Sequence, residues 1–426
     1  MIIDFLIKGI LRDKARSLLP IVVVMIGVFT VIFMDGIVGG MMDNMVRMTA
    51  KFQTGHVKVI SRAYWEDKEQ SPIDLALMNA KALEESLQKD FPTMDWVERI
   101  PFGGLLDIPA SNRETRTQGP VFGTAYNFLG AKDKEKIVER LGLQDALVVG
   151  KLIERTNEVL VSIDFAEKYK VEPGDDVTFF GSTMYSSMTF GNYKVAGIVR
   201  FGNPLLDRGA IFMDIADARI LLDMEDAVSE LLGFFPDDRY DRQAAEEVKE
   251  AFNGAHRGDK DEYAPYMVQL ADQNAMDEML AYASETSMFM LIILVVALSI
   301  VLWNAGIIGG IRRYNEFGLR IALGEGKGHI FCTLLIESFF IGIIGSVCGT
   351  ILALLLCLYI QSYGIDYSAM MQNMTLMIDP VIRAKVTTRM YYIGFIPGVC
   401  SMILGSALAG RAIFKRQTAT LFKELD

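Results

Sequence analysis

The chain has few of the residues that metal sites and disulfide frameworks require. Its 426 residues include only three histidines and four cysteines. The histidines are scattered, and no Cys/His spacing typical of a zinc site is present. The cysteines all lie in long apolar runs, at Cys332, Cys348, Cys357 and Cys400. We therefore expect no metal site, and no disulfide framework in the polar part of the chain.

Motifs of common hydrolases and nucleotide-binding enzymes are also missing. The sequence contains no G-x-S-x-G and no H-E-x-x-H. A P-loop needs Lys followed by Ser or Thr, whereas Lys327 is followed by Gly328. No carboxylate stands out as catalytic. We predict a non-catalytic chain that binds no cofactor directly, so that ATP and Mg²⁺ would be held by a partner.

The charge distribution argues against a nucleic-acid partner. The net charge is −11. Residues 54–283 hold 25 Lys and Arg against 41 Asp and Glu, a net charge of −16. Nucleic-acid binding requires clustered cations, and this segment is acidic.

Hydrophobic residues make up 51% of the chain and are concentrated in four runs, at 18–34, 288–308, 330–359 and 391–409. A bilayer-spanning helix needs about 20 apolar residues. The polar segment between the first two runs is long enough to bury its own core. We predict an α-helical membrane protein with four transmembrane helices and a large extracytoplasmic mixed α/β domain between helices one and two.

Lysine and arginine are biased toward one side of the predicted membrane. Residues 1–17, 311–328 and 411–426 hold four each, against three in 361–389. The bias is modest, and Arg47 and Lys51 weaken it. By the positive-inside rule it places both termini in the cytoplasm and residues 54–283 outside.

Residues 311–337 (IRRYNEFGLRIALGEGKGHIFCTLLIE) lie between the second and third apolar runs. The spacing of apolar and charged residues predicts a short amphipathic helix along the membrane surface. Gly324 would end it, since glycine tolerates the backbone turn of a C-cap.

The string 316–324 (EFGLRIALG) resembles the E-x-G-x-R-x-A-x-G signature of FtsX-like ABC-transporter permeases, which include lipoprotein-releasing and macrolide-exporter permeases. The resemblance implies a coupling helix that docks on a separate ATPase. The candidate coupling residues are Arg313, Glu316, Gly318, Leu319, Arg320, Ala322 and Gly324. For Glu337 two readings stay open: pairing with Arg320, or reaching toward the cytoplasmic interface.

Methionines follow the first apolar run and precede the second. Flexible thioethers suit surfaces that accept varied apolar shapes. The candidate substrate-cavity residues are Met34, Met41, Met42, Met45, Met48, Met279 and Met288. Helix–helix packing is the alternative. For Asp35, near the end of the first run, access to interfacial water is favoured over a functional role.

The outer domain is predicted to be mixed α/β. Strands are expected at 55–60, 158–163, 177–180 and 192–201, and helices at 79–91, 132–141, 164–169, 215–222 and 242–252. Residues 55–66 (GHVKVISRAYWE) resemble the start of the outer domain of lipoprotein-releasing permeases. The order of elements over 158–199 resembles the β-rich subdomain of macrolide-exporter periplasmic domains. Loop 181–191 is either an idle hairpin or a partner contact.

We divide the chain into a cytoplasmic amphipathic helix (1–17), transmembrane helix 1 and stalk (18–53), a periplasmic α/β domain of two subdomains (54–270), stalk and transmembrane helix 2 (271–310), the coupling-helix loop (311–328), transmembrane helix 3 (329–360), a periplasmic loop (361–389), transmembrane helix 4 (390–410) and a cytoplasmic tail (411–426).

By resemblance, the chain is a permease of the bacterial inner membrane. Its partners would be two ATPase subunits, a second permease (a copy or a paralogue), membrane lipid, and a lipoprotein substrate or periplasmic acceptor. The cargo would be lipoproteins or other amphiphiles of the outer leaflet. The alternatives are an FtsX-like regulator of a periplasmic enzyme and an efflux permease for small amphiphiles.

Overall fold

The computed structural model describes residues 14–67, 73–109, 115–130, 134–256, 261–273, 276–311, 314–366 and 381–415. Two compact units are present. The helical unit comprises Met1–Asp43, Ala281–Ile365 and Ile382–Asp426, and the α/β unit comprises Asn44–Leu280 and Asp366–Val381. Most of the predicted N-terminal helix, most of the loop before the last apolar run, and most of the C-terminal tail lie outside the described residues.

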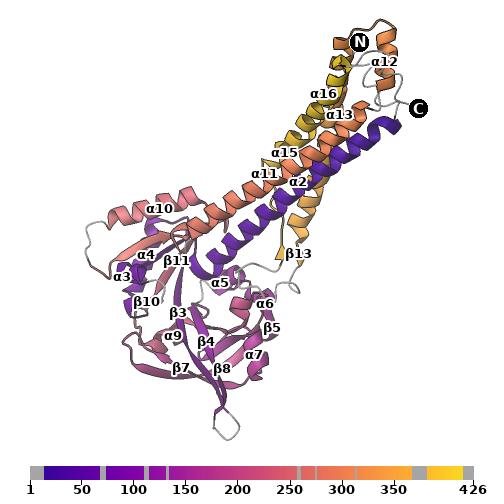
Figure 1. The fold of residues 1–426 in the computed structure, drawn as a ribbon. Helices are drawn as coiled ribbons and strands as arrows, with labels where there is room; N and C mark the ends of the chain where they lie inside the picture. The colour runs from indigo at the N-terminus through magenta and orange to yellow at the C-terminus, as the bar shows by residue number, and fades with distance from the viewer. Residues whose placement is uncertain are drawn as a thin grey trace. The chain divides into compact units, whose positions relative to one another are not determined.

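The long helices carry the apolar runs (Figure 1). They are α2 (Lys14–Thr49), α11 (Met276–Ile311), α13 (Lys327–Tyr363) and α16 (Ser401–Lys415), and α16 follows α15 (Met390–Ile393) and the π-helical turn η5 (Ile396–Cys400). Three described stretches are long and apolar enough to cross a membrane, namely Leu18–Thr54, Lys327–Tyr363 and Met390–Arg411. The second predicted run lies in α11, where the described apolar stretch is the shorter Ile292–Val301.

Small residues allow close helix packing in the helical unit. A Cβ atom added at Gly349 of α13 would lie 2.6 Å from the Met25 carbonyl oxygen of α2. One added at Gly398 would lie 2.1 Å from the Ser346 hydroxyl of α13. The glycines therefore let backbones approach, as small residues do in membrane helix pairs.

A ten-stranded sheet organises the α/β unit, in the order β12-β1-β11-β3-β4-β9-β6-β8-β5, with β7 pairing β3 and β8. The strands are β1 (Val57–Ser61), β3 (Asp95–Pro109), β4 (Thr115–Tyr126), β5 (Leu147–Gly150), β6 (Glu158–Ser162), β7 (Asp176–Ser182), β8 (Met188–Val199), β9 (Ala210–Asp214), β11 (Glu230–Phe234) and β12 (Pro265–Gln269). Because β7 bridges β3 and β8, six strands close into a ring: β3, β4, β9, β6, β8 and β7.

Helices cover this sheet: α3 (Arg62–Glu66), α4 (Ala80–Asp90), α5 (Lys134–Leu141), α6 (Leu143–Ala146), α7 (Ile163–Tyr169), α8 (Pro204–Asp207), α9 (Ile215–Leu222) and α10 (Arg242–Ala255). Two short two-stranded sheets complete the described strands: β2 (Leu77–Met78) pairs with β10 (Ala227–Val228), and β13 (Ile365–Asp366) pairs with β14 (Val381–Ile382). The strands and helices predicted from the sequence are confirmed, with shifts of a few residues at their ends.

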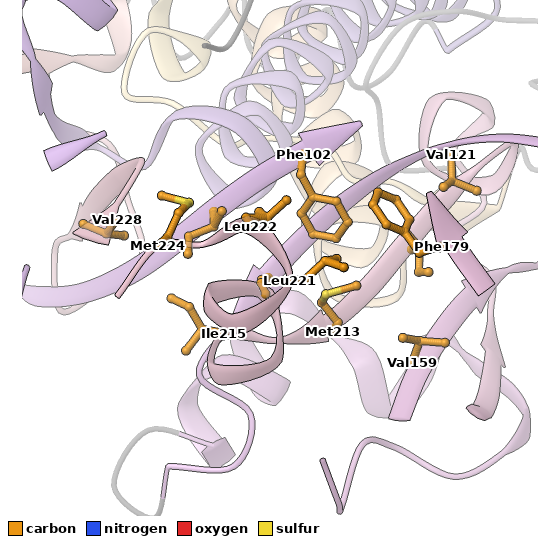
Figure 2. Packing of buried hydrophobic residues seen from close by; sticks show 14 of the residues in the cluster. Phe102, Val121, Val159, Phe179, Met213, Ile215, Leu221, Leu222, Met224 and Val228 are labelled. Carbon is orange, nitrogen blue, oxygen red and sulfur yellow. The ribbon is translucent and has the colours of Figure 1, made fainter. Parts of the chain in front are cut away.

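One buried cluster of the α/β unit, part of which Figure 2 shows, includes residues of the ring strands and of α9. It also includes Val57 of β1 and Leu87 of α4, and a second cluster contains Phe52 and Phe234. Phe102 of β3 and Phe179 of β7 meet edge to face, with ring centroids 5.3 Å apart. Met213 of β9 and Leu221 of α9 are buried in the same cluster. Alternate residues of β7 point into this core, as expected for strands with one buried face.

Candidate functional site

The predicted amphipathic helix is present as α12 (Tyr314–Ala322), between α11 and α13 in the chain (Figure 1). Phe317 is 3% exposed and packs with Ile330 and Leu334 of α13. Leu319 and Leu323, by contrast, are 58% and 79% exposed. Exposed large apolar side chains beside charged ones are typical of protein contact surfaces. The helix thus has an anchored face and an open apolar face.

Gly324 ends α12 as predicted. Its φ angle is +92°, a conformation that L side chains rarely adopt. The Gly324 amide donates to the Ile321 carbonyl and the Glu325 amide donates to the Arg320 carbonyl, both at 3.0 Å. This pair of bonds is the Schellman motif, which satisfies the last carbonyls of a helix. An added Cβ at Gly324 would meet nothing within 4 Å, so the backbone angle is the reason for glycine here.

The side chain of Arg320 pairs with Glu325. Its Nε and one terminal nitrogen lie 2.6 Å and 2.9 Å from the two carboxylate oxygens. The suggested pairing of Arg320 with Glu337 is wrong. Glu337 is only 8% exposed among the buried residues of α13, so the alternative of a side chain reaching interfacial water does not fit either.

The other candidate coupling residues take different positions. Gly318 is buried, Glu316 is half-buried and Ala322 is exposed. Arg313 lies outside the described residues. The structure thus brings Leu319 and Ala322 to the exposed part of α12, and Gly318 to its packed part.

A buried charge cluster holds the end of the first long helix in the α/β unit. Arg99 of β3 pairs with Glu230 of β11, and its other donors bind the carbonyls of Phe52, at 2.7 Å, and Gln53. Phe52 and Gln53 belong to the π-helical turn η1 (Ala50–Thr54), which follows α2 directly. The guanidinium therefore donates to carbonyls at the end of the helix, where the helix itself supplies no donors.

Glu230 is saturated with donors. Lys58 Nζ lies 2.9 Å and the Tyr64 hydroxyl 3.0 Å from the same carboxylate oxygen. Burial alone would raise the pKa of Glu230, but the charges of Arg99 and Lys58 outweigh it and lower the pKa to about 2. A cavity of about 300 Å³ adjoins this cluster and is lined in part by Trp65.

Comparison with known families decides the identity of the chain. Residues 17–282 match the MacB-like periplasmic core domain, and residues 287–418 match the FtsX-like permease C-terminal domain. The chain belongs to the FtsX/MacB-like family of ABC-transporter permeases. The permease is therefore a bacterial inner-membrane protein with an extracytoplasmic α/β domain, and its family works with an ABC ATPase.

Among solved structures, the periplasmic region of MacB from Actinobacillus actinomycetemcomitans is similar at 14% identity, with a TM-score of 0.35. The match covers 53% of this chain and 94% of that one. No curated protein is significantly similar in sequence to the permease.

The candidate methionines do not share one environment. Met45 and Met48 are buried, and Met48 packs in a core cluster with Phe52. Met41 and Met42 are half-buried, whereas Met34, Met279 and Met288 are exposed. Core packing accounts for Met48, and the cavity hypothesis rests on the exposed members of the set.

Sequence reasoning missed two ion-pair sites in the permease. In the helical unit, Asp35 of α2, for which we expect access to interfacial water, also pairs with Arg389 at 2.6 Å. Nearby, Lys385 pairs with Asp43 and donates its amide to the Gly36 carbonyl at 3.0 Å. The other missed site is the Arg99–Glu230 cluster, whose partners lie 131 residues apart. A carboxylate at the end of an apolar run was a signal for the first site; no local signal exists for the second.

Proposed function

We propose that the chain is the permease subunit of a transporter in which a partner ATPase drives movement of the extracytoplasmic domain. In this proposal the chain has four membrane spans, which are the three described apolar stretches and α11, and both termini lie in the cytoplasm. Helix α12 then lies on the side of the membrane where ATP is available. Two ATPase subunits and a second permease, identical or paralogous, complete the assembly. The cargo is a lipoprotein or another amphiphile of the outer leaflet.

The observation that carries this proposal is the two-faced anchoring of α12. Phe317 fixes the helix to α13, while Leu319 and Leu323 remain open to a partner. A push on the open face therefore moves α13 with it, because the packed face cannot slide freely. Such coupling through rigid elements is a known mode of conformational transmission.

A second feature supports transmission along the first helix. Helix α2 is continuous from Lys14 to Thr49. Arg99 of β3 then donates to carbonyls of the π-helical turn that follows α2, and Glu230 of β11 holds Arg99 in place. A buried, multiply bonded anchor resists bending, so displacement of α2 along its axis is passed to the sheet.

The decisive experiment uses Arg320→Glu and Gly318→Pro in the full chain, with ATPase stimulation and complex assembly as readouts. We expect both to fall, since one variant reverses the charge beside the open face and the other breaks the helix. Lys327→Gln, which changes one charge in the neighbouring turn, is the control. Unchanged stimulation and assembly in both α12 variants would refute the coupling role.

The cargo requires a separate test. Tandem-affinity purification from membranes, followed by protein and lipid mass spectrometry, is expected to recover a lipoprotein with the permease. Recovery of a cell-wall hydrolase instead would favour the regulatory alternative. Recovery of an outer-membrane duct protein would favour efflux of small molecules.

A further inference from the structure

Glu325 joins two helices through three interactions. Its backbone amide completes the C-cap of α12 by binding the Arg320 carbonyl at 3.0 Å. Its carboxylate accepts two hydrogen bonds from the Arg320 guanidinium. The same carboxylate lies 2.7 Å from Nδ1 of His329, in the first turn of α13. One side chain thus connects the end of α12 to the start of α13.

This arrangement replaces the usual contact of a Schellman motif. The two residues that flank the motif, here Arg320 and Glu325, commonly make an apolar contact. In this chain they carry opposite charges, and the planar guanidinium meets the carboxylate in a two-pronged geometry that fixes orientation as well as distance. The carboxylate also precedes the positive end of the α13 dipole, where a negative charge is favourable.

The carboxylate stays ionised in this setting. Partial burial alone would raise the pKa of Glu325, but hydrogen bonds from His329 and Arg320 outweigh that effect and lower it. The Arg320 side chain nevertheless keeps 36% of its surface exposed. The Arg320 guanidinium is therefore held in one orientation, while part of the side chain remains accessible to a binding partner.

We infer that Glu325 is a positioning residue for coupling: it fixes the guanidinium of Arg320 and the α12–α13 turn, so that a carboxylate or carbonyl acceptor on the partner ATPase meets a pre-oriented donor. This inference rests on the proposed function. Pre-orientation raises affinity because less side-chain freedom is lost on binding. The same interactions stiffen the α12–α13 turn, so that a movement of α12 is transmitted to α13.

The test compares Glu325→Gln with Lys327→Gln in the full chain assembled with its ATPase. Glu325→Gln keeps the shape but removes the charge that orients Arg320. We expect the concentration of permease needed for half-maximal ATPase stimulation to rise roughly fivefold, the upper range for a partly exposed ion pair. Lys327→Gln is expected to stay near wild type. An equal effect of both variants overturns the inference, since loop charge alone would then explain it.

A charge exchange separates positioning from simple structural support. Arg320→Glu/Glu325→Arg restores an ion pair within the turn but turns a carboxylate toward the partner. Stimulation should remain low in this double variant, although the turn is again paired. Full recovery would show that the pair only stabilises the turn, and the positioning role would be lost.

Hydrogen exchange on the permease without ATPase gives an independent readout. Glu325→Gln should speed amide exchange over residues 319–330 relative to Lys327→Gln, since the turn loses its central carboxylate. If Glu325→Gln changes neither exchange nor stimulation, the inference fails even where Arg320→Glu abolishes coupling. If exchange rises while Arg320→Glu and Gly318→Pro leave stimulation intact, the proposed function fails instead.

Discussion

The buried Arg99–Glu230 pair allows the anchoring of α2 to be measured. The Glu230 side chain is 3% exposed, and Arg99→Ala would leave it with Lys58 as its one cationic partner among the described residues. The Phe52 and Gln53 carbonyls would lose the guanidinium as a donor. Removing one partner of a buried ion pair costs about 3–5 kcal/mol, because the other charge is left uncompensated. For a unit of this size, each kcal/mol lost from the free energy of unfolding lowers the thermal unfolding midpoint by about 2–4 °C. We therefore expect the unfolding midpoint to fall by about 10 °C.

The assay is thermal unfolding of the detergent-solubilised full chain, followed by tryptophan fluorescence. Arg200→Ala is the matched control, since Arg200 is largely exposed and lies 3.6 Å from an exposed Glu167. Its loss should cost less than about 1 kcal/mol. The double variant Arg99→Met/Glu230→Gln should recover only part of the loss: the buried carboxylate that Arg99 compensates is also removed, but Lys58 then loses Glu230 as an ion-pair partner. If the unfolding midpoint of Arg99→Ala lies within about 2 °C of that of Arg200→Ala, the Arg99–Glu230 pair does not measurably stabilise the protein, and the reasoning is refuted.

Three further predictions concern glycines and one buried acid. Gly40→Ala places a Cβ 1.8 Å from the Arg383 carbonyl oxygen, whereas Gly39→Ala meets nothing within 4 Å; only the first should lower the thermal midpoint. Gly324→Ala should cost about 1 kcal/mol through its positive φ and should speed exchange at the end of α12. Burial raises the pKa of Asp207 to about 6, above its value in the unfolded chain. The folded state is therefore most favoured when Asp207 is protonated, and this contribution to the free energy of unfolding is lost as pH rises through about 4 to 6. Asp207→Asn should flatten that pH dependence of unfolding, and an unchanged slope would contradict the assignment.

Local sequence patterns predicted the helices and strands well, because these elements depend mainly on residues that are close together in the chain. The alternation at 55–60 predicted β1, and the spacing of apolar and charged residues over 314–323 with Gly324 predicted α12 and its cap. Ion pairs between distant segments could not be predicted in this way. Arg99 and Glu230 become neighbours only because β3 pairs β11 in register, with Arg99 opposite Glu230. A single sequence does not reveal that register.

At the candidate site, too, the helix could be predicted from the sequence but its side-chain contacts could not. The sequence indicated which residues of α12 carry the family signature, but not that Arg320 turns to Glu325 rather than Glu337. That choice depends on the C-cap, which brings residues 320 and 325 together, and on the burial of Glu337 within α13. Side-chain partners across a turn follow from backbone geometry that periodicity does not encode.

The closed ring of six strands has a consequence for solubility. Because β7 pairs on both sides, the described residues of these strands leave no open edge along the ring where β3, β7 and β8 meet. Met188 and Phe190 are 90% and 70% exposed on β8. Aggregation by strand addition requires a free row of backbone donors and acceptors. The domain can thus display bare aromatic and thioether groups to its surroundings without seeding fibres there.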